Sequence, residues 1–276
     1  MVFDIDMQRL QAIFSLYHAE NKMYIHQLST WPELNWDSKP LLPLLSEIRY
    51  KQGRLLGHMQ SLGFDLQKEA QLEILSQDII ASNAIEGEFL SSEDVRSSIA
   101  NRLGIQIGLP PAKRHVEGIV TMMMNATQQY LLPVTEERLF QWHAMLFPTA
   151  RDNFGRKMIV GNWRQSPMQV VSRNMGEEHL HFEAPKAAIL SAEMTLFLKW
   201  LNEKEIEPVL KSAIAHLWFV TIHPFDDGNG RIARAILDLL LAHSDKTQLR
   251  FYSLSEQIRI DKKSYYQELE RAQKGD

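Results

Sequence analysis

Two strongly apolar runs near the end of the chain constrain its fold more than any other feature. Residues 211–222 read KSAIAHLWFVTI and residues 231–243 read RIARAILDLLLAH. Each run is apolar on nearly all sides at helical spacing, which is typical of helices surrounded by other helices. We therefore expect the two helices to form the centre of the core, and a short polar stretch joins them.

Helical periodicity recurs through most of the rest of the chain. Residues 40–63 carry a stripe of leucine and isoleucine side chains and predict one long helix that stops at Gly63. Residues 135–147 predict another helix, with Thr135 as the N-cap and acidic residues in the first turn. This pattern favours an all-α fold.

One segment departs from helical periodicity. Two short runs of β-forming residues, 158–160 and 168–172, lie on either side of a middle that contains Pro167. The pattern predicts a small hairpin between these two runs. From the residues alone, a plain surface hairpin and a functional flap are equally good interpretations.

Composition narrows the classes of function. The chain has no cysteine, which excludes disulfides, thiolate nucleophiles and cysteine-based zinc sites and is consistent with a cytoplasmic protein. Its net charge of -4 gives no general attraction to nucleic acid. The first residues, MVFDIDMQRLQAIF, are acidic where a secretory signal would be basic. No apolar run reaches the roughly eighteen residues that would indicate a membrane helix.

The polar stretch between the two apolar runs, TIHPFDDGNGRIAR, concentrates reactive side chains at residues 221–234. Because Gly228 and Gly230 flank Asn229 directly before a helix, backbone N–H groups there can converge on an anion such as phosphate. A glycine–asparagine–glycine step by itself is weak evidence, and an ordinary tight turn is its more common interpretation.

Arg231 and Arg234 lie three residues apart in the first turn of that helix. Positive charge at this end of a helix opposes the helix dipole. Two guanidinium groups are therefore expected where a polyanion lies between them and the turn, because they offer forked donors to more than one phosphate. A surface salt bridge is the simpler alternative.

The acidic residues and the histidine of the stretch suggest metal and proton chemistry. Asp226 and Asp227 would repel a bare phosphate, but one carboxylate beside a phosphate suits Mg²⁺. His223 can take a proton from an incoming hydroxyl. A hydrolase site of His223 and the two aspartates is an alternative, although it leaves Arg234 without a role. His216, on about the same helix face, is expected to be a packed core residue.

The stretch matches the Fic-family pattern HxFx[D/E]GNGRxxR at every specified position, from His223 to Arg234. The chain therefore resembles the Fic family. The resemblance implies a compact helical bundle with a β-hairpin flap, and it implies transfer of AMP from ATP to a Ser, Thr or Tyr hydroxyl of a target protein.

The resemblance also implies roles for individual residues. His223 would be the base that deprotonates the hydroxyl, and Asp227 would hold Mg²⁺ at the phosphates. Arg231 would neutralise charge as pyrophosphate leaves, and Asp226 inherits no role. The phosphates would be cradled by Asn229 and the backbone N–H groups around it, including those of Gly228 and Gly230.

A second match lies closer to the amino terminus. Ser82–Gly87, SNAIEG, fits the [S/T]xxxE[G/N] inhibitory signature of some Fic proteins. The resemblance implies that Glu86 pairs with Arg234 and so denies this arginine to the γ-phosphate of ATP. Without the family, Glu86 is interpreted as the solvated end of a helix with Gly87 as its C-cap.

Two further regions have counterparts in the family. The edge of the flap, which would add a strand of the target protein, corresponds to Met168, Gln169, Val170 and Val171. The stretch SYYQELERAQKGD resembles a later helix that lines the nucleoside pocket, and its candidates are Tyr265, Tyr266 and Gln273. All three could equally be helix-packing residues.

The resemblance divides the chain into three parts. Residues 1–22 are an extension of unknown role, and residues 23–112 are an amino-terminal helical region, similar to that of a bacterial Fic subgroup, which carries the inhibitory helix. Residues 113–276 are the Fic core, shortened relative to the subgroup, which continues into a winged-helix region. We expect no DNA binding and no membrane association from this chain, and the family implies a homodimer.

The sequence thus predicts a cytoplasmic protein adenylyltransferase that uses ATP and Mg²⁺, modifies a protein target and itself, and is inhibited by Glu86. One alternative is a hydrolase that removes AMP at the same site, because AMP-removing members use a similar glutamate to align water. Another is a nucleotide-sensing regulatory module, for which His223 has no use.

Overall fold

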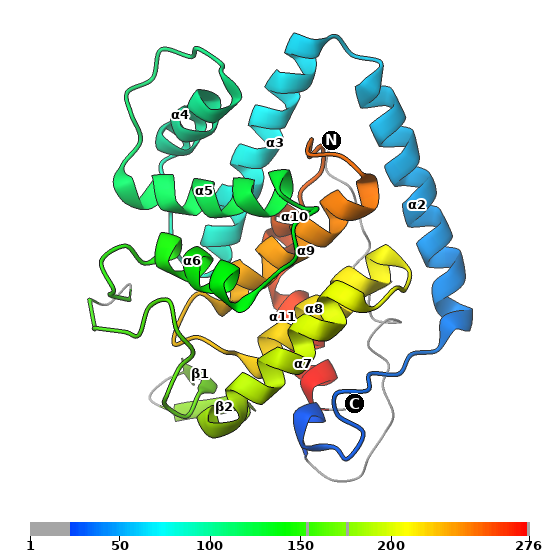
Figure 1. The fold of residues 1–276 in the computed structure, drawn as a ribbon, viewed down its shortest axis with the longest axis vertical. Coiled ribbons are helices and arrows are strands. Elements are labelled where there is room, and N and C mark those ends of the chain that lie inside the picture. The colour runs from blue at the N-terminus through cyan, green and yellow to red at the C-terminus, as the bar shows by residue number, and fades with distance from the viewer. Residues whose placement is uncertain (1–22, 153–154, 175–176, 275–276) are drawn as a thin grey trace.

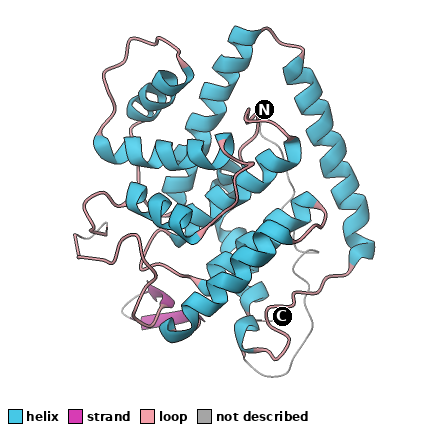
Figure 2. Cartoon of the chain, in the orientation of Figure 1, coloured by secondary structure: helices cyan, strands magenta, loops and turns pink. Residues whose placement is uncertain are grey.

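Helices make up most of the computed structural model, which describes residues 23–152, 155–174 and 177–274 (Figures 1 and 2). The expected all-α class is confirmed, with one small two-stranded sheet. The helices are η2 (Ile25–Gln27), α2 (Ser38–Gln60), α3 (Phe64–Ile85), α4 (Ser92–Leu103), α5 (Arg114–Gln128), α6 (Glu136–Leu146), η3 (Ala187–Ile189), α7 (Leu190–Glu203), α8 (Pro208–Ile222), α9 (Asn229–Asp245), α10 (Leu254–Ile260) and α11 (Lys262–Gln273).

The two apolar runs form α8 and α9, which cross the middle of the bundle side by side (Figure 1). Nearly every side chain of both helices is buried, as their apolar composition requires. The loop that joins them therefore starts and ends on the best-packed elements of the molecule. This arrangement gives the polar stretch 223–228 a rigid support.

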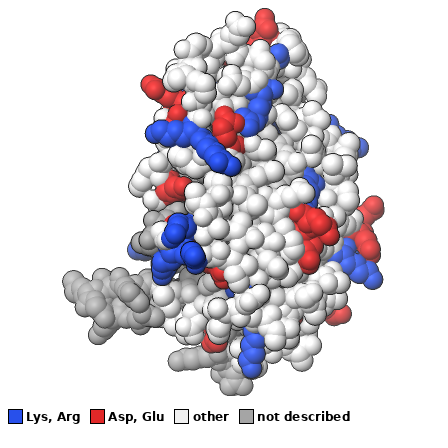
Figure 3. Space-filling view, turned by 60° about the vertical axis from the view of Figure 1, so that its left-hand side comes forward, with Lys and Arg blue, Asp and Glu red and all other residues white. Residues whose placement is uncertain are grey.

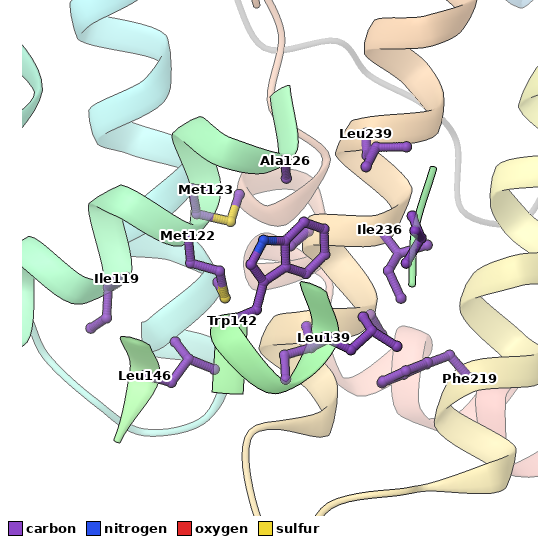
Figure 4. Close-up of a cluster of buried hydrophobic side chains, with 14 of the residues drawn as sticks. Ile119, Met122, Met123, Ala126, Leu139, Trp142, Leu146, Phe219, Ile236 and Leu239 are labelled. Carbon is purple, nitrogen blue, oxygen red and sulfur yellow. The ribbon is translucent and has the colours of Figure 1, made fainter. Parts of the chain in front are cut away.

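Trp142 of α6 lies at the centre of the main hydrophobic core (Figure 4). Its ring is fully buried among side chains of α5, α6, α8 and α9, which include Met122, Met123, Leu139, Phe219 and Ile236. The indole N–H donates to Asn125 Oδ1 at 2.8 Å, so its one polar group is satisfied inside the core. This core joins the α5–α6 pair to α9.

The amino-terminal helices depart from the expectation at one point. The predicted helix over 40–63 begins at Ser38 and ends at Gln60. Gly63 does not terminate it, because this glycine has extended backbone angles, φ -63 and ψ 156, and is the N-cap of α3. At the other end of α3, Glu86 is the C-cap, so the prediction of Gly87 as the cap is wrong by one position, although Gly87 follows with the left-handed backbone, φ +80, that a glycine allows there.

The hairpin is present, but its strands are not the two predicted ones. Strand β1 (Gln169–Asn174) pairs antiparallel with β2 (Glu177–Glu183), so the prediction of residues 158–160 as the partner is wrong. The N–H groups of that run serve other acceptors: Met158 donates to Ala150 O at 3.2 Å and Ile159 donates to Asp226 Oδ2 at 3.1 Å. The run therefore packs beside the polar loop instead of forming a strand.

On the face drawn in Figure 3, basic and acidic side chains are interspersed among uncharged ones, and no broad basic patch covers that face. Within the described ranges, no helix combines the length and the apolar character that crossing a membrane requires. The predicted extension 1–22 lies outside the described residues.

Gly118 of α5 provides a test of this packing. A Cβ atom at Gly118 would lie 2.1 Å from the carbonyl oxygen of Met145 in α6, so Gly118→Ala must push the two helices apart. We expect it to lower the free energy of unfolding by about 1–3 kcal/mol, measured by urea denaturation. Gly53→Ala in α2 is the matched control, since nothing lies within 4 Å of that position. Equal stability of the two variants would contradict the helix packing described.

Candidate active site

The polar loop begins where α8 ends. His223 is the C-cap of α8 in a left-handed conformation, φ 51 and ψ 61, which is costly for a residue with a Cβ atom. Arg164 stabilises this turn through hydrogen bonds to the backbone: its buried guanidinium donates to His223 O at 2.8 Å and to Pro185 O at 2.6 Å. No pattern in the sequence indicates this role of Arg164.

The imidazole of His223 is oriented by the backbone of the preceding turn. Its Nδ1 lies 3.1 Å from Val220 O, and because a carbonyl only accepts, Nδ1 carries the proton and Nε2 is left as a base. Burial lowers the pKa of His223 to about 4, and the charge of Arg164 acts in the same direction. The ring is therefore neutral at pH 7.

Gly228 and Asn229 turn the loop into α9. Gly228 has φ +80, and a Cβ atom there would lie 2.8 Å from the ring of Phe147, so only glycine fits. The side chain of Asn229 closes the loop on itself: Oδ1 accepts from Phe225 N at 2.9 Å and Nδ2 donates to Phe225 O at 2.8 Å. For an anion, Asn229 thus offers its main-chain N–H, not its side chain.

The buried guanidinium of Arg234 contacts the end of α3. It donates to Ser82 Oγ at 2.9 Å and to Ser82 O at 2.7 Å, and it forms an ion pair with Glu86 Oε1 at 2.8 Å. Burial opposes charge on Glu86, but the attraction of Arg234 and the hydrogen bond from it prevail, and the pKa of Glu86 lies below its usual value. Both groups are charged at neutral pH.

The carboxylate of Glu86 lies directly against the amino-terminal turn of α9. A Cβ atom at Gly230 would come within 2.2 Å of Glu86 Oε1, so the absence of a side chain at Gly230 makes room for the carboxylate. The first N–H groups of a helix have no acceptor within the helix, and this end carries positive partial charge. The carboxylate therefore lies beside the turn where the sequence predicts an anion.

Arg231 pairs with a second carboxylate of the same segment. Its Nη1 contacts Glu88, and its guanidinium lies over the ring of Phe147 at 5.0 Å. Nε and Nη2 are buried and have no hydrogen-bond partner among the described residues. Such a group is costly to bury without an acceptor, so Arg231 has donors to spare for an anion.

The two aspartates have different surroundings. Asp226 accepts from the backbone of Ile159 and is held inside the loop. The side chain of Asp227 is 40% exposed and lies 3.8 Å from Arg231 Nη2. No group of three or more His, Cys, Asp or Glu side chains within the described ranges could hold a metal. A lone carboxylate beside phosphates nevertheless fits Mg²⁺, which keeps several waters and takes one or two protein oxygens.

The predicted nucleoside residues of α11 are only partly brought together. Tyr265 lies at the site: its hydroxyl is 2.7 Å from His216 Nε2, and Tyr266 packs edge-on against it at 5.1 Å. Gln273 is buried and donates to Thr221 Oγ1 at 3.3 Å, so its amide is directed at α8. His216 is a packed core residue, and burial lowers its pKa to about 4.

Three of the predicted flap residues, Gln169 to Val171, lie on β1, and among the described residues β1 pairs with β2 alone. Met168 accepts from Ala184 N at 3.0 Å at the base of the hairpin, and Gln169 is the first residue of β1. Val170 and Val171 are 37% and 39% exposed. The free edge of β1 can accept another strand.

Besides Arg164, two further residues near the loop were missed by sequence reasoning. Glu88 lies two positions after Glu86 and could have been suspected once that segment was placed against the arginines. His143, on α6, contacts the backbone of Asp227, but the sequence around it shows only the pattern of a packed helix. Only the tertiary fold identifies it.

Comparison with known proteins gives the site a context. Residues 133–241 match the model of the Fic/DOC family, and residues 24–105 match a domain of unknown function, DUF4172. The protein adenylyltransferase Fic of Nematostella vectensis is 25% identical over 224 residues, which is 76% of this chain and 46% of that protein. The uridine 5'-monophosphate transferase of Xanthomonas campestris pv. campestris is 32% identical over 117 residues, or 40% of this chain and 21% of that protein.

Solved structures show the same fold. A Fic family protein from Desulfovibrio desulfuricans superimposes with a TM-score of 0.60 at 24% identity, over 84% of this chain and 68% of the other. A Fic domain containing signaling protein from Bacteroides thetaiotaomicron gives 0.54 at 19% identity, over 84% and 97%. The chain spans less than half the length of the two curated relatives named above.

Acid is expected to destabilise the fold through its buried histidines. The pKa values of His26 and His216 fall from 6.5 to about 4 in the folded chain because burial disfavours the charged ring. Between pH 6.5 and pH 4 the unfolded chain therefore binds more protons than the folded chain. The contribution of these neutral histidines to the free energy of unfolding is fully present above pH 6.5 and is lost as the pH falls toward 4. At pH 5 the loss from His216 is about 2 kcal/mol.

His216→Gln removes this titration while retaining a polar side chain beside Tyr265. Urea denaturation at pH 7 and pH 5 should show a smaller acid loss in the variant than in the natural protein. The same loss in both proteins would show that His216 does not titrate as its burial requires.

Proposed function

The chain is a member of the Fic/DOC family, and from that premise we propose that it is a protein adenylyltransferase. It transfers AMP from ATP to a Ser, Thr or Tyr hydroxyl of a target protein, and the protein itself is among its targets. Similarity to proteins named protein adenylyltransferase supports this activity.

The observation that carries the proposal is the anion position at the start of α9. The carboxylate of Glu86 lies at this position, where it contacts Arg234 at 2.8 Å and lies against Gly230. Glu86 and Glu88 balance the charges of the two guanidinium groups, but two buried nitrogen donors of Arg231, Nε and Nη2, have no acceptor among the described residues. A triphosphate matches that charge and offers acceptors for all of these donors.

His223 would act as the general base. Its Nδ1 is fixed on Val220 O, so Nε2 accepts the proton of the attacking hydroxyl. The hydroxyl oxygen forms a bond to the α-phosphorus as the bond to the β-phosphate oxygen breaks, and pyrophosphate leaves with the electron pair. Although the free protein holds the pKa of His223 at about 4, the negative phosphates of a bound nucleotide raise it and strengthen the base.

Asp227 would hold Mg²⁺, because its exposed carboxylate lies beside the phosphate position. The ion supplies neutralisation of phosphate charge when it is bound. The free donors of Arg231 face the same anion position and stabilise the charge that develops on the leaving group.

We propose that Glu86 inhibits the enzyme by occupying Arg234. The γ-phosphate of ATP needs the same guanidinium, and a carboxylate at that place both satisfies the arginine and repels the nucleotide. Glu88 binds Arg231 from the same segment, so movement of the end of α3 would release both arginines together. A cytoplasmic location and a homodimer remain family-based proposals.

The target is proposed to bind at the open edge of β1. A strand added there would run beside Val170 and Val171, and its backbone N–H and C=O groups would pair with those of β1. Arg164 links this flap to His223, the proposed general base. Its guanidinium donates to Ser166 O and Pro185 O at the start and end of the hairpin and also to His223 O. A bound strand is thereby held at a fixed place relative to His223.

Intact-mass spectrometry after incubation with ATP and Mg²⁺ tests the activity and its inhibition together. We expect a gain of one or more AMP units that is stronger in Glu86→Gly than in the natural protein, because Arg234 becomes available. His223→Ala in the Glu86→Gly background should show no gain although ATP affinity is retained, since the base is lost and the phosphate site is not.

The alternatives give different outcomes in the same assay. Modification that persists without His223 would remove this residue from the mechanism. If no variant gains mass but the protein releases AMP from an AMP-modified protein, the site is a hydrolase. ATP binding without either reaction would favour a nucleotide-sensing module.

A further inference from the structure

His143 contacts the polar loop at residues 223–228, yet no step of the proposed reaction uses it. Its side chain is fully buried. Nε2 lies 3.2 Å from Asp227 O, and Nδ1 accepts the N–H of Gly161 at 3.2 Å. Because the Gly161 N–H can only donate, Nδ1 is the unprotonated nitrogen, so Nε2 carries the hydrogen and donates it to the Asp227 carbonyl.

The ring of His143 is also held on its faces. It stacks on Phe225 with centroids 4.2 Å apart and planes 18° from parallel, and it meets Phe147 edge-on at 5.1 Å. Phe147 in turn lies under the guanidinium of Arg231 at 5.0 Å. The imidazole thus supports the loop on one side and, through Phe147, the phosphate-facing arginine on the other.

The hydrogen bond to Asp227 has a particular geometric consequence. The carbonyl of Asp227 and the N–H of Gly228 belong to one planar peptide group, so fixing the oxygen fixes the direction of the N–H. The N–H of Gly228 donates to the carboxylate of Asp227, with Oδ1 at 2.5 Å. Gly228, with φ +80, is at a position where this peptide could rotate if the Asp227 carbonyl were not held. Rotation would break the contact between the Gly228 N–H and the Asp227 carboxylate and release that carboxylate from its place.

We propose that His143 is a positioning residue for nucleotide binding: its Nε2–H fixes the peptide between Asp227 and Gly228, and the N–H of that peptide holds the carboxylate of Asp227 where it would bind a metal ion at the phosphates. The inference rests on the proposed function, because it concerns the same phosphate site. It adds a residue of α6 that touches neither the nucleotide nor the target hydroxyl.

Two substitutions separate this role from a merely structural one. In His143→Gln, the amide reaches the place of Nε2 and can donate to Asp227 O, but nothing accepts from Gly161. In His143→Asn, the shorter amide lies near Nδ1 and can accept from Gly161, but the bond to Asp227 is lost. Both variants lose the aromatic stacking, so a purely structural role predicts the same defect in both.

The test is made in the Glu86→Gly background, in which nucleotide access is not limited by inhibition. We expect His143→Asn to raise the KM for Mg²⁺-ATP and the Kd for ATP by about tenfold, the size of one lost hydrogen bond at the loop. The kcat should change less, because His223 keeps its contacts with Val220 and Arg164. His143→Gln should restore KM and Kd to within about threefold.

Equal Kd values in the two variants would overturn the positioning role while leaving the proposed function intact. Failure of the Glu86→Gly protein itself to bind ATP in calorimetry would overturn the proposed function and this inference with it. ¹⁵N NMR of histidine-labelled natural protein tests the geometry even if neither variant folds: His143 must be neutral with its proton on Nε2, and a proton on Nδ1 would contradict the inference.

Discussion

Two guanidinium groups buried at the positive end of a helix dipole set the main physical constraint on this molecule. Arg231 and Arg234 are both almost completely buried, and their place in the first turn of α9 adds to the electrostatic cost. Such a pair requires anions. In the structure, these are Glu86 and Glu88 at the end of α3, so the amino-terminal helices are needed to complete the charge balance of the catalytic helix.

The same constraint explains how binding and inhibition can share one place. The N-terminal turn of α9 is preorganised by a rigid helix pair and by glycines at 228 and 230, where a Cβ atom would meet Phe147 or Glu86. It holds whichever anion reaches it, a carboxylate of its own chain or a phosphate. Under the proposed function, inhibition would be competition for donors that are already in place, and it would need no rearrangement of His223 or Asp227.

Local sequence patterns were sufficient for the features that depend on neighbouring residues. Periodicity and backbone chemistry account for the apolar runs of α8 and α9, the N-cap Thr135 and the positive φ of Gly87. A short family pattern was enough to predict that His223 lies beside the glycine turn at residues 228–230. Among features that depend on distant contacts, the pair of Glu86 and Arg234 was predicted from the family resemblance, but others were not predictable. Residues 158–160 have β propensity, but Asp226 takes the N–H of Ile159, and the role of His143 depends on a carbonyl 84 positions away.

The most direct test of the account is calorimetric binding of ATP and of AMP to the natural protein and to Glu86→Gly. If Glu86 excludes nucleotide by occupying Arg234 where the γ-phosphate would bind, the substitution should tighten ATP binding by about tenfold or more and leave AMP, which has no γ-phosphate, nearly unchanged. An equal gain for both nucleotides, or no gain for either, would contradict competition between this carboxylate and the γ-phosphate.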